Sequence, residues 1–416
     1  MYLPQKPKER IEVLDAIRGF ALLGILMVNL PLMYEPISKI MLGGTGDNLT
    51  LLEMFSESFI KFFFEGKFFL IFSMLFGYGF FIFLQKTAES NSSVLSLYRR
   101  RLFILLLFGL AHIVLLWGGD VLLVYAIFGF LLLLFRKSGD KKIIRWAIFF
   151  ILIPILILTV LTFLLLFLNG FPEIKTELDL MNKENNLYYE ELINRARSTY
   201  STGAFGNIIL MRLEEYADSF FTSLIFFCPT IMGMFLIGFL SARKGLFTDL
   251  ANKAALFKKI LFRSLLIGLL ANTGFVIIMY HSDTLSLDLY FLLGTTMGLI
   301  GGIAFSLCYI SIITLLFING KANLLSKTLV PMGRMALTNY LMQSTICAFI
   351  FHSYGLGFYG KVAVWHGILL AFLIYALQVI FSRIWLSYFY FGPLEWLWRS
   401  LTYGKFQEMK RKKQSA

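Results

Sequence analysis

The stretch Arg101-LFILLLFGLA-His112-IVLLW (residues 101–117) is an apolar run with one ionisable side chain near its middle. A membrane-spanning helix needs roughly 20 mostly apolar residues, and it satisfies its own backbone hydrogen bonds inside the lipid. An imidazole in hydrocarbon is costly unless it faces the interior of a helix bundle or a wet cavity. The stretch therefore predicts a membrane helix in which His112 is a candidate site residue.

The composition extends this prediction to the whole chain. Its 416 residues are 58% hydrophobic and 15% charged, whereas soluble domains carry about a quarter charged residues. The net charge of +13 is explained by Lys and Arg in the loops between spans, where these residues set orientation. We expect a single integral-membrane domain over residues 1–416, with the lipid bilayer as its partner and no nucleic acid.

Long apolar runs recur along the chain, and they predict an all-α polytopic protein with about ten transmembrane helices. The runs lie at about 17–35, 60–85, 101–118, 120–136, 143–169, 219–242, 257–281, 288–318, 328–352 and 365–388. Cys228, Cys308 and Cys347 lie inside such runs without the spacing of metal ligands, so we expect buried thiols and no metal site.

Basic residues concentrate in alternate loops, and this pattern predicts the orientation. The loops at 99–101, 136–142, 243–259 and 321–327 are basic, and so is the tail at 410–413. Lys and Arg favour the cytoplasmic side, so both termini are expected there, with residues 389–416 as a cytoplasmic tail.

The one larger extracytoplasmic loop, 170–218, has mixed charge. We expect it to form short amphipathic helices on the outer face, either as a lid over a cavity or as a plain connector.

Several spans place a polar group at a similar depth. His112 lies about 16 Å beyond Arg101 at a rise of 1.5 Å per residue, and Asn29, Ser73, Asn272 and Asn339 reach depths of about 13 to 18 Å from the same side. If these helices face one another, the polar groups line a hydrated pocket around His112. The alternative is that each Asn forms a hydrogen bond between two helices.

The span at 328–352 is the most polar. Asn339 and Gln343 are four residues apart and share a face, while Arg334 lies deep enough to need an anionic partner. That partner would be a carboxylate, a lipid phosphate or a bound substrate. Asp15 and Arg18, three residues apart in the first span, can pair locally. The expected substrate pocket consists of Asp15, Arg18, Ser73, Asp120, Arg334 and Gln343.

Asp120 suggests a relay with His112, but the spacing argues against direct contact. Eight residues separate the two, which is about 12 Å if the helix continues. We therefore predict no direct hydrogen bond, and expect Asp120 to orient an acceptor or to cap the span that begins there.

Six blocks of sequence resemble the YeiB-like family of bacterial membrane proteins (domain of unknown function 418). They are Arg10-IEVLDAIRGFALLGILMVN, Gly66-KFFLIFSMLFGYG, Arg100-RLFILLLFGLAH, Trp117-GGDVLLVYA, Gly333-RMALTNYLMQS and Gly392-PLEWLWRSLTYG. The blocks run from the first span to the tail. The resemblance implies a multi-pass protein of the bacterial plasma membrane.

Two shorter patterns are similar to known enzymes. The start of the first span resembles that of heparan-α-glucosaminide N-acetyltransferase, and the Arg101–His112 spacing is similar to the basic-x10-His pattern of acyltransferases that modify cell-surface sugars. These similarities imply a transmembrane acyltransferase with no permanently bound cofactor. Acyl-CoA would enter as a co-substrate from the cytoplasm, and the acyl group would pass to an acceptor in the cell envelope.

As an acyltransferase, the protein would use His112 as the general base on an acceptor hydroxyl or amine. Asn29 or Asn339 would donate to the developing oxyanion. Arg99, Arg100 and Arg101 would hold the CoA phosphates, although setting the topology is a sufficient role for these arginines.

The alternative hypothesis is a transporter or permease for a small polar or anionic solute. Arg334 and His112 would then be the substrate and proton-coupling groups. Many spans, a polar layer and the glycine-rich span at 288–318 suit this hypothesis as well.

Overall fold

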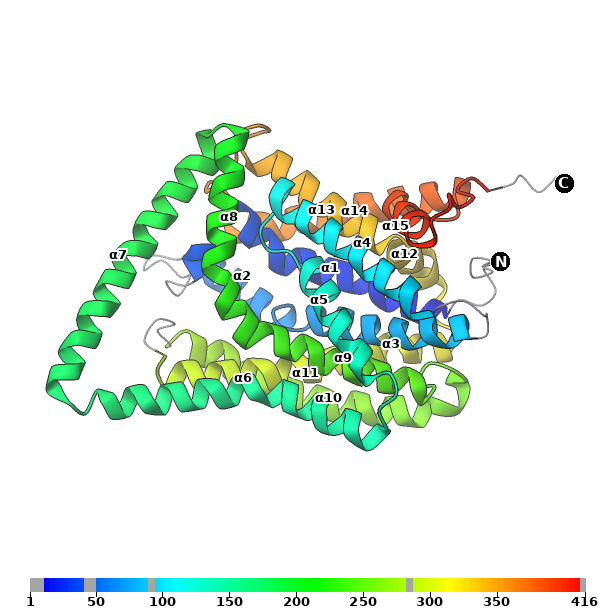
Figure 1. Ribbon diagram of the computed structural model, residues 1–416, viewed down its shortest axis with the longest axis horizontal. Coiled ribbons are helices and arrows are strands. Elements are labelled where there is room, and N and C mark those ends of the chain that lie inside the picture. The colour runs from blue at the N-terminus through cyan, green and yellow to red at the C-terminus, as the bar shows by residue number, and fades with distance from the viewer. Residues whose placement is uncertain (1–10, 41–49, 89–93, 282–286, 412–416) are drawn as a thin grey trace.

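The computed structural model describes residues 11–40, 50–88, 94–281 and 287–411. The described chain is helical, and its one β-type feature is an isolated bridge between Phe389 and Lys410. Residues 412–416 of the predicted tail lie outside the described ranges. Figure 1 shows most helices running side by side across the view, with α7 and α8 crossing one end of the bundle.

The N-terminal half contributes the first six α-helices and two 3-10 turns. The first helix, α1, contacts α3, α12, α13 and α14 and so lies at the centre of the bundle. The elements are α1 (Glu12–Tyr34), η2 (Ile37–Ile40), α2 (Leu51–Phe63), α3 (Phe68–Ala88), α4 (Val94–Leu115), α5 (Leu122–Leu132), η3 (Leu133–Phe135) and α6 (Asp140–Leu168).

The C-terminal half contributes the remaining helices. It pairs α10 with α11, α9 with α3 and α6, and α15 with α4. The elements are α7 (Pro172–Thr202), α8 (Phe205–Thr222), the π-helix η4 (Ser223–Phe227), α9 (Cys228–Arg243), η5 (Leu250–Lys253), α10 (Ala254–Met279), α11 (Leu289–Ile318), α12 (Asn323–Arg334), α13 (Ala336–Phe351), α14 (Val364–Tyr388) and α15 (Pro393–Tyr403).

The prediction of an all-α membrane protein is confirmed at this level. Seven helical segments in the described ranges are long and apolar enough to cross a membrane: α1, α2 with α3, α6, α8 with α9, η5 with α10, α11 and α14. The helices α5 with η3 and α13 are apolar but shorter. The count of ten spans and the cytoplasmic position of both termini stay predictions.

Two expectations about local structure need correction. The predicted span at 328–352 is two helices, α12 and α13, with a break at Met335 (φ −113°, ψ 33°). The loop at 170–218 does not form only short helices, because α7 is 31 residues long and begins with Pro172 in its first turn. Proline favours that position because its missing N–H would have no partner there.

The break at Met335 follows a close crossing of α12 and α1. A side chain at Gly333 would collide with the backbone oxygen of Asp15. The absence of a Cβ lets the two helix backbones touch.

Candidate functional site

His112 forms two buried hydrogen-bond contacts through its ring. Its Nδ1 lies 2.8 Å from Oδ1 of Asp120, and its Nε2 lies 2.8 Å from Oγ of Ser344 on α13. The relative exposure of these residues is 1% for His112, 9% for Asp120 and 1% for Ser344, and the side chains of His112 and Asp120 are both 0% exposed. We call these three residues the His112 relay. The expectation that His112 and Asp120 are too far apart to bond is wrong.

The chain reverses direction directly after His112, which explains the error. The helix α4 ends at Leu115, and the backbone N–H groups of Leu116 and Trp117 both donate to the His112 carbonyl at 2.9 Å. The chain then turns at residues 118–120, where the Asp120 backbone N–H donates to the Gly118 carbonyl at 2.9 Å. A Cβ at Gly119 would collide with the Trp117 ring, so glycine lets this ring lie against the turn. The estimate of about 12 Å assumed a helix that continues, and this helix stops.

Asp120 is held in place by the next helix and by a small residue on α4. Its Oδ2 accepts a hydrogen bond of 2.6 Å from the backbone N–H of Leu123 in the first turn of α5. A Cβ on Gly109 would lie 2.9 Å from this oxygen and would collide with the Leu123 nitrogen. Glycine one turn before His112 therefore admits the carboxylate, and the predicted capping role of Asp120 fits this bond to α5.

Ser344 is the residue that sequence reasoning missed. It lies one turn beyond Tyr340, whose ring centroid is 5.1 Å from that of His112. Ser344 is the last residue of one of the blocks that resemble the YeiB-like family. That block is the sequence feature from which Ser344 could have been proposed as a site residue. The depth argument included the hydroxyl of Ser73 but not that of Ser344, which directly follows Gln343 in the chain.

A cavity of about 450 Å³ lies beside the relay. Asp120 lines it, whereas His112 and Ser344 lie behind that wall. Asn29 also lines it and makes no hydrogen bond with the described residues. The rest of the wall comes from α1, the corner between α2 and α3, the loop at 117–120, α5 and the junction of α8, η4 and α9.

Tyr125 connects the cavity wall to another predicted residue. The Tyr125 hydroxyl lies 2.8 Å from the hydroxyl of Ser73 and donates to the Phe69 carbonyl at 3.0 Å. Tyr125 lines the cavity, so Ser73 stands one side chain behind it. The structure therefore brings Asn29, Ser73, Asp120 and His112 to one region.

Asn339 and Gln343 belong to a different network, between α13 and α14. The Asn339 amide donates to the Ser382 hydroxyl at 2.9 Å, and the Gln343 amide donates to Oε1 of Gln378 at 2.9 Å. Gln378 in turn donates to the Asn339 carbonyl at 2.9 Å. We call these four residues the amide network. Asn339 and Gln343 do not line the cavity, which corrects their expected place in a pocket around His112.

Asn272 also bonds one helix to another. Its amide donates to the carbonyls of Gly268 on α10 and Gly301 on α11, at 2.7 and 3.1 Å. The alternative expectation, a hydrogen bond between helices, thus holds for this residue. The shared depth of the five polar groups does not make one pocket.

The predicted charged residues near the start of α1 and around α12 lie away from the cavity. Asp15 accepts a hydrogen bond of 2.6 Å from Arg18, the local pair expected from their spacing. Arg334 donates to the Tyr390 carbonyl at 3.3 Å. None of these three residues lines the cavity, so their expected place in the substrate pocket is also corrected.

The three arginines at the start of α4 differ in their surroundings. Arg99 and Arg100 are exposed. The Arg101 guanidinium lies 4.0 Å from the ring centroid of Trp398 on α15, and the Trp398 indole donates to the Arg101 carbonyl at 3.0 Å. Arg101 therefore fastens α4 to α15, while Arg99 and Arg100 face the solvent side.

Comparison with known proteins extends over nearly the full length. The family model "Protein of unknown function (DUF418)" matches residues 241–405. The chain is 32% identical over 430 residues to "Uncharacterized protein YxaH" of Bacillus subtilis (strain 168), covering 98% of each chain. It is 28% identical over 407 residues to "Uncharacterized protein YeiB" of Escherichia coli (strain K12), covering 95% of this chain and 96% of the relative.

The chain belongs to the YeiB-like DUF418 family. The matched segment 241–405 contains Ser344 and the whole amide network. His112 and Asp120 lie outside it, in the part of the chain that the full-length relatives cover. In this DUF418 protein the relay therefore joins the two halves of the sequence.

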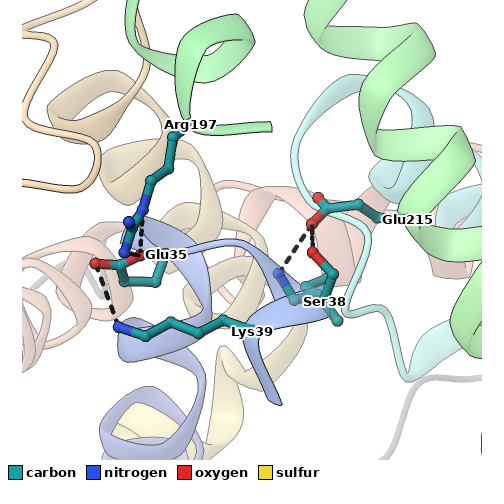
Figure 2. A network of polar contacts seen from close by, with 6 residues as sticks. Glu35, Ser38, Lys39, Arg197 and Glu215 are labelled. Atoms are coloured by element: carbon teal, nitrogen blue, oxygen red, sulfur yellow. Dashed lines mark hydrogen bonds and ion pairs between the residues drawn. The ribbon is translucent and has the colours of Figure 1, made fainter. Parts of the chain in front are cut away.

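A set of polar contacts fastens α7 and α8 of this DUF418 protein to the end of α1. Figure 2 shows Arg197 and Lys39 on either side of Glu35, with N–O distances of 2.8 and 3.6 Å. It also shows Glu215 of α8 at the start of η2, where it accepts from the Ile37 backbone at 2.9 Å and from Ser38. We call Glu35, Ser38, Lys39, Arg197 and Glu215 the polar clamp.

The clamp continues into a buried group beside the loop at 117–120. The Tyr200 hydroxyl donates to Oε2 of Glu215 at 2.8 Å, and Arg212 donates to the Val114 carbonyl at 2.6 Å. Burial and the Glu215 carboxylate raise the pKa of Tyr200 well above its usual value, so this hydroxyl stays a donor. Through these bonds α8 is held against the end of α4, next to the loop that carries Asp120.

Proposed function

We propose that this protein is an integral-membrane acyltransferase that moves an acyl group from acyl-CoA to an acceptor in the cell envelope. The observation that carries the proposal is the His112 relay beside the cavity. A hydroxyl, an imidazole and a carboxylate in hydrogen-bond series are the arrangement that activates oxygen nucleophiles in acyl transfer.

The contact with the Asp120 carboxylate indicates which nitrogen of the His112 ring carries the proton. Asp120 accepts from Nδ1–H, which leaves Nε2 as the basic nitrogen that accepts from Ser344. The acceptor hydroxyl or amine attacks the thioester carbonyl, and its proton passes to Nε2 of His112, directly or through the Ser344 hydroxyl. The C–S bond breaks, and the CoA sulfur leaves with that proton. Asn29 faces the cavity with an amide that can donate to the oxyanion.

Because His112 lies behind Asp120, the proposal includes a shift of the loop at 117–120 during turnover. Gly118 and Gly119 give this loop the backbone freedom that such a shift needs. Arg212 holds α8 against the neighbouring end of α4, so the shift is coupled to α8.

The exposed arginines at the start of α4 are proposed to bind the CoA phosphates. Arg99 and Arg100 are available for this role, while Arg101 already stacks on Trp398. Guanidinium groups pair with phosphate oxygens through two parallel hydrogen bonds.

The test is acetyl-CoA binding to the purified protein, measured by calorimetry in detergent. We expect saturable binding that weakens by about tenfold, or 1.4 kcal/mol, in the Arg99→Ala/Arg100→Ala variant and at raised salt. The matched control is Lys141→Ala/Lys142→Ala, two exposed basic residues at the start of α6. No binding of acetyl-CoA or of longer acyl-CoAs would contradict the proposal. Counterflow of a labelled solute without CoA would favour the transporter hypothesis instead.

A further inference from the structure

The wall of the cavity beside η4 is thin. Phe220 and Leu224 line the cavity, and these residues are 37% and 41% exposed. Thr222 and Ser223 also line the cavity and are exposed. A single helical segment therefore lies between the cavity and the surroundings of the bundle here.

The surface outside that wall is apolar. Phe221 and Ile225 are 70% and 40% exposed, and they lie in the segment Phe205–Arg243, which is long and apolar enough to span a membrane. Large exposed apolar side chains on such a segment face lipid. The thin wall is thus a boundary between the cavity and the bilayer.

This wall also has an irregular backbone. Residues Ser223–Phe227 form a π-helix between α8 and α9. π-helical turns inside α-helices are rare and frequent at functional sites. The Phe227 ring centroid lies 4.4 Å from that of Phe69, so the π-helix packs against the start of α3, which also lines the cavity.

The cavity is amphiphilic. Its lining is mostly apolar, with Ile25, Val28, Phe64, Phe69 and Val124 among the wall residues, and the Asn29 side chain and the Asp120 backbone supply polar groups. An apolar pocket with a few convergent polar groups suits a ligand with a hydrocarbon part and a polar part.

We propose that the cavity binds the hydrocarbon chain of a lipid-anchored acceptor, which enters from the bilayer past Ser223–Phe227. The apolar wall holds the chain, and the amine or hydroxyl of the head group lies beside Asn29 and Asp120. This inference rests on the proposed acyl transfer and names the substrate class of its acceptor.

The test is photolabelling in phosphatidylcholine nanodiscs that contain a small fraction of a lipid with a diazirine in one acyl chain. Three probes share that chain and carry an ethanolamine, a glycerol or a choline head group. Peptide mapping compares label at Val28 and Val124, which line the cavity, with label at Leu270, which is 69% exposed on α10. We expect label at both kinds of position.

Filling the cavity sharpens the test. We expect Val124→Trp to lower label at Val28 by about tenfold, since excluding about two methylene groups has an effect of that size on occupancy. Val124→Phe is a milder second variant if the tryptophan prevents folding. Val160→Trp on the exposed face of α6 is the control, and it should change nothing.

The outcomes separate the two proposals. Stronger cavity label from the ethanolamine and glycerol probes than from the choline probe, lost in Asn29→Leu, would support the assignment. Equal label from all three head groups, or label only at Leu270, would overturn it. If acyl-CoA binds but the cavity is not labelled, the proposed acyl transfer stands and the lipid-anchored acceptor is contradicted. If the cavity is labelled but no acyl-CoA binds, the lipid site stands and the proposed acyl transfer is contradicted.

Discussion

The His112 relay and the amide network share α13 and are both buried, yet their surroundings differ. The relay combines an ionisable pair with a hydroxyl, and its Asp120 lines the cavity. The amide network contains only neutral side chains that bond α13 to α14. The predicted depth along the helices is similar for residues of both sets, so depth does not distinguish them. Contact with a cavity distinguishes a candidate functional site from a hydrogen-bond network that only holds helices together.

The largest expected effect is that of His112→Ala on transfer. Removal of a general base should lower the rate by about 10³- to 10⁴-fold. The measurement is transfer of labelled acyl groups by protein reconstituted in liposomes. The control is His366→Ala, an exposed histidine at the start of α14. If His112→Ala and wild type turned over equally fast, the His112 relay would be a structural network like the amide network, which would contradict the proposal.

Asp120→Asn should have the next largest effect, a rate loss of about 10²-fold. The amide keeps an oxygen that can accept from Leu123, so α5 should still form. It no longer compels Nδ1 to carry the proton, so His112 loses its fixed tautomer. The kinetic measurement is paired with circular dichroism of the same sample. A rate within twofold of wild type would show that Asp120 only stabilises the start of α5 and has no role in catalysis.

Asn339→Leu should act on stability and leave catalysis intact. Loss of one hydrogen bond between membrane helices should lower the free energy of unfolding by about 1–2 kcal/mol. Thermal unfolding in detergent measures this change, and Asn319→Leu, at an exposed position after α11, is the control. Turnover per folded molecule should match wild type. A rate loss as large as that of His112→Ala would place the amide network in the reaction.

Arg197→Ala in the polar clamp should have the smallest effect. The Arg197 side chain is 42% exposed, and an exposed ion pair contributes below about 1 kcal/mol. Limited proteolysis should cut α7 faster in this variant, and the difference from wild type should shrink at about 1 M salt, where screening acts within about 3 Å. Arg195→Ala is the control, because Arg195 pairs with Glu214 instead of α1. An identical cleavage pattern in both variants would show that the clamp does not hold α7.

The sequence predicted an all-α protein with long apolar helices, because long apolar runs determine such helices directly. It also predicted the Asp15–Arg18 pair, which depends only on spacing within one helix. The bond between His112 and Asp120 could not be predicted in this way, since it depends on where α4 ends and how residues 116–119 turn. The contact between Ser344 and His112 could not be predicted for a related reason. They lie 232 residues apart, and only the packing of α4 against α13 brings them together.

The depth argument failed for Asn272 and Asn339 because rise along a helix gives no information about rotation around it. Both side chains point toward a neighbouring helix and not toward the cavity. The same limit applies to Gln343, which faces Gln378. Asn29 stands at a similar depth and faces the cavity.

The most direct test of the central claim is release of CoA thiol from acyl-CoA by reconstituted protein, with and without an envelope lipid extract. The account predicts thiol release that requires the extract, is lost in His112→Ala and persists in Asn339→Leu. Absence of thiol release with every acyl-CoA, together with exchange of a labelled solute across the same liposomes, would contradict it.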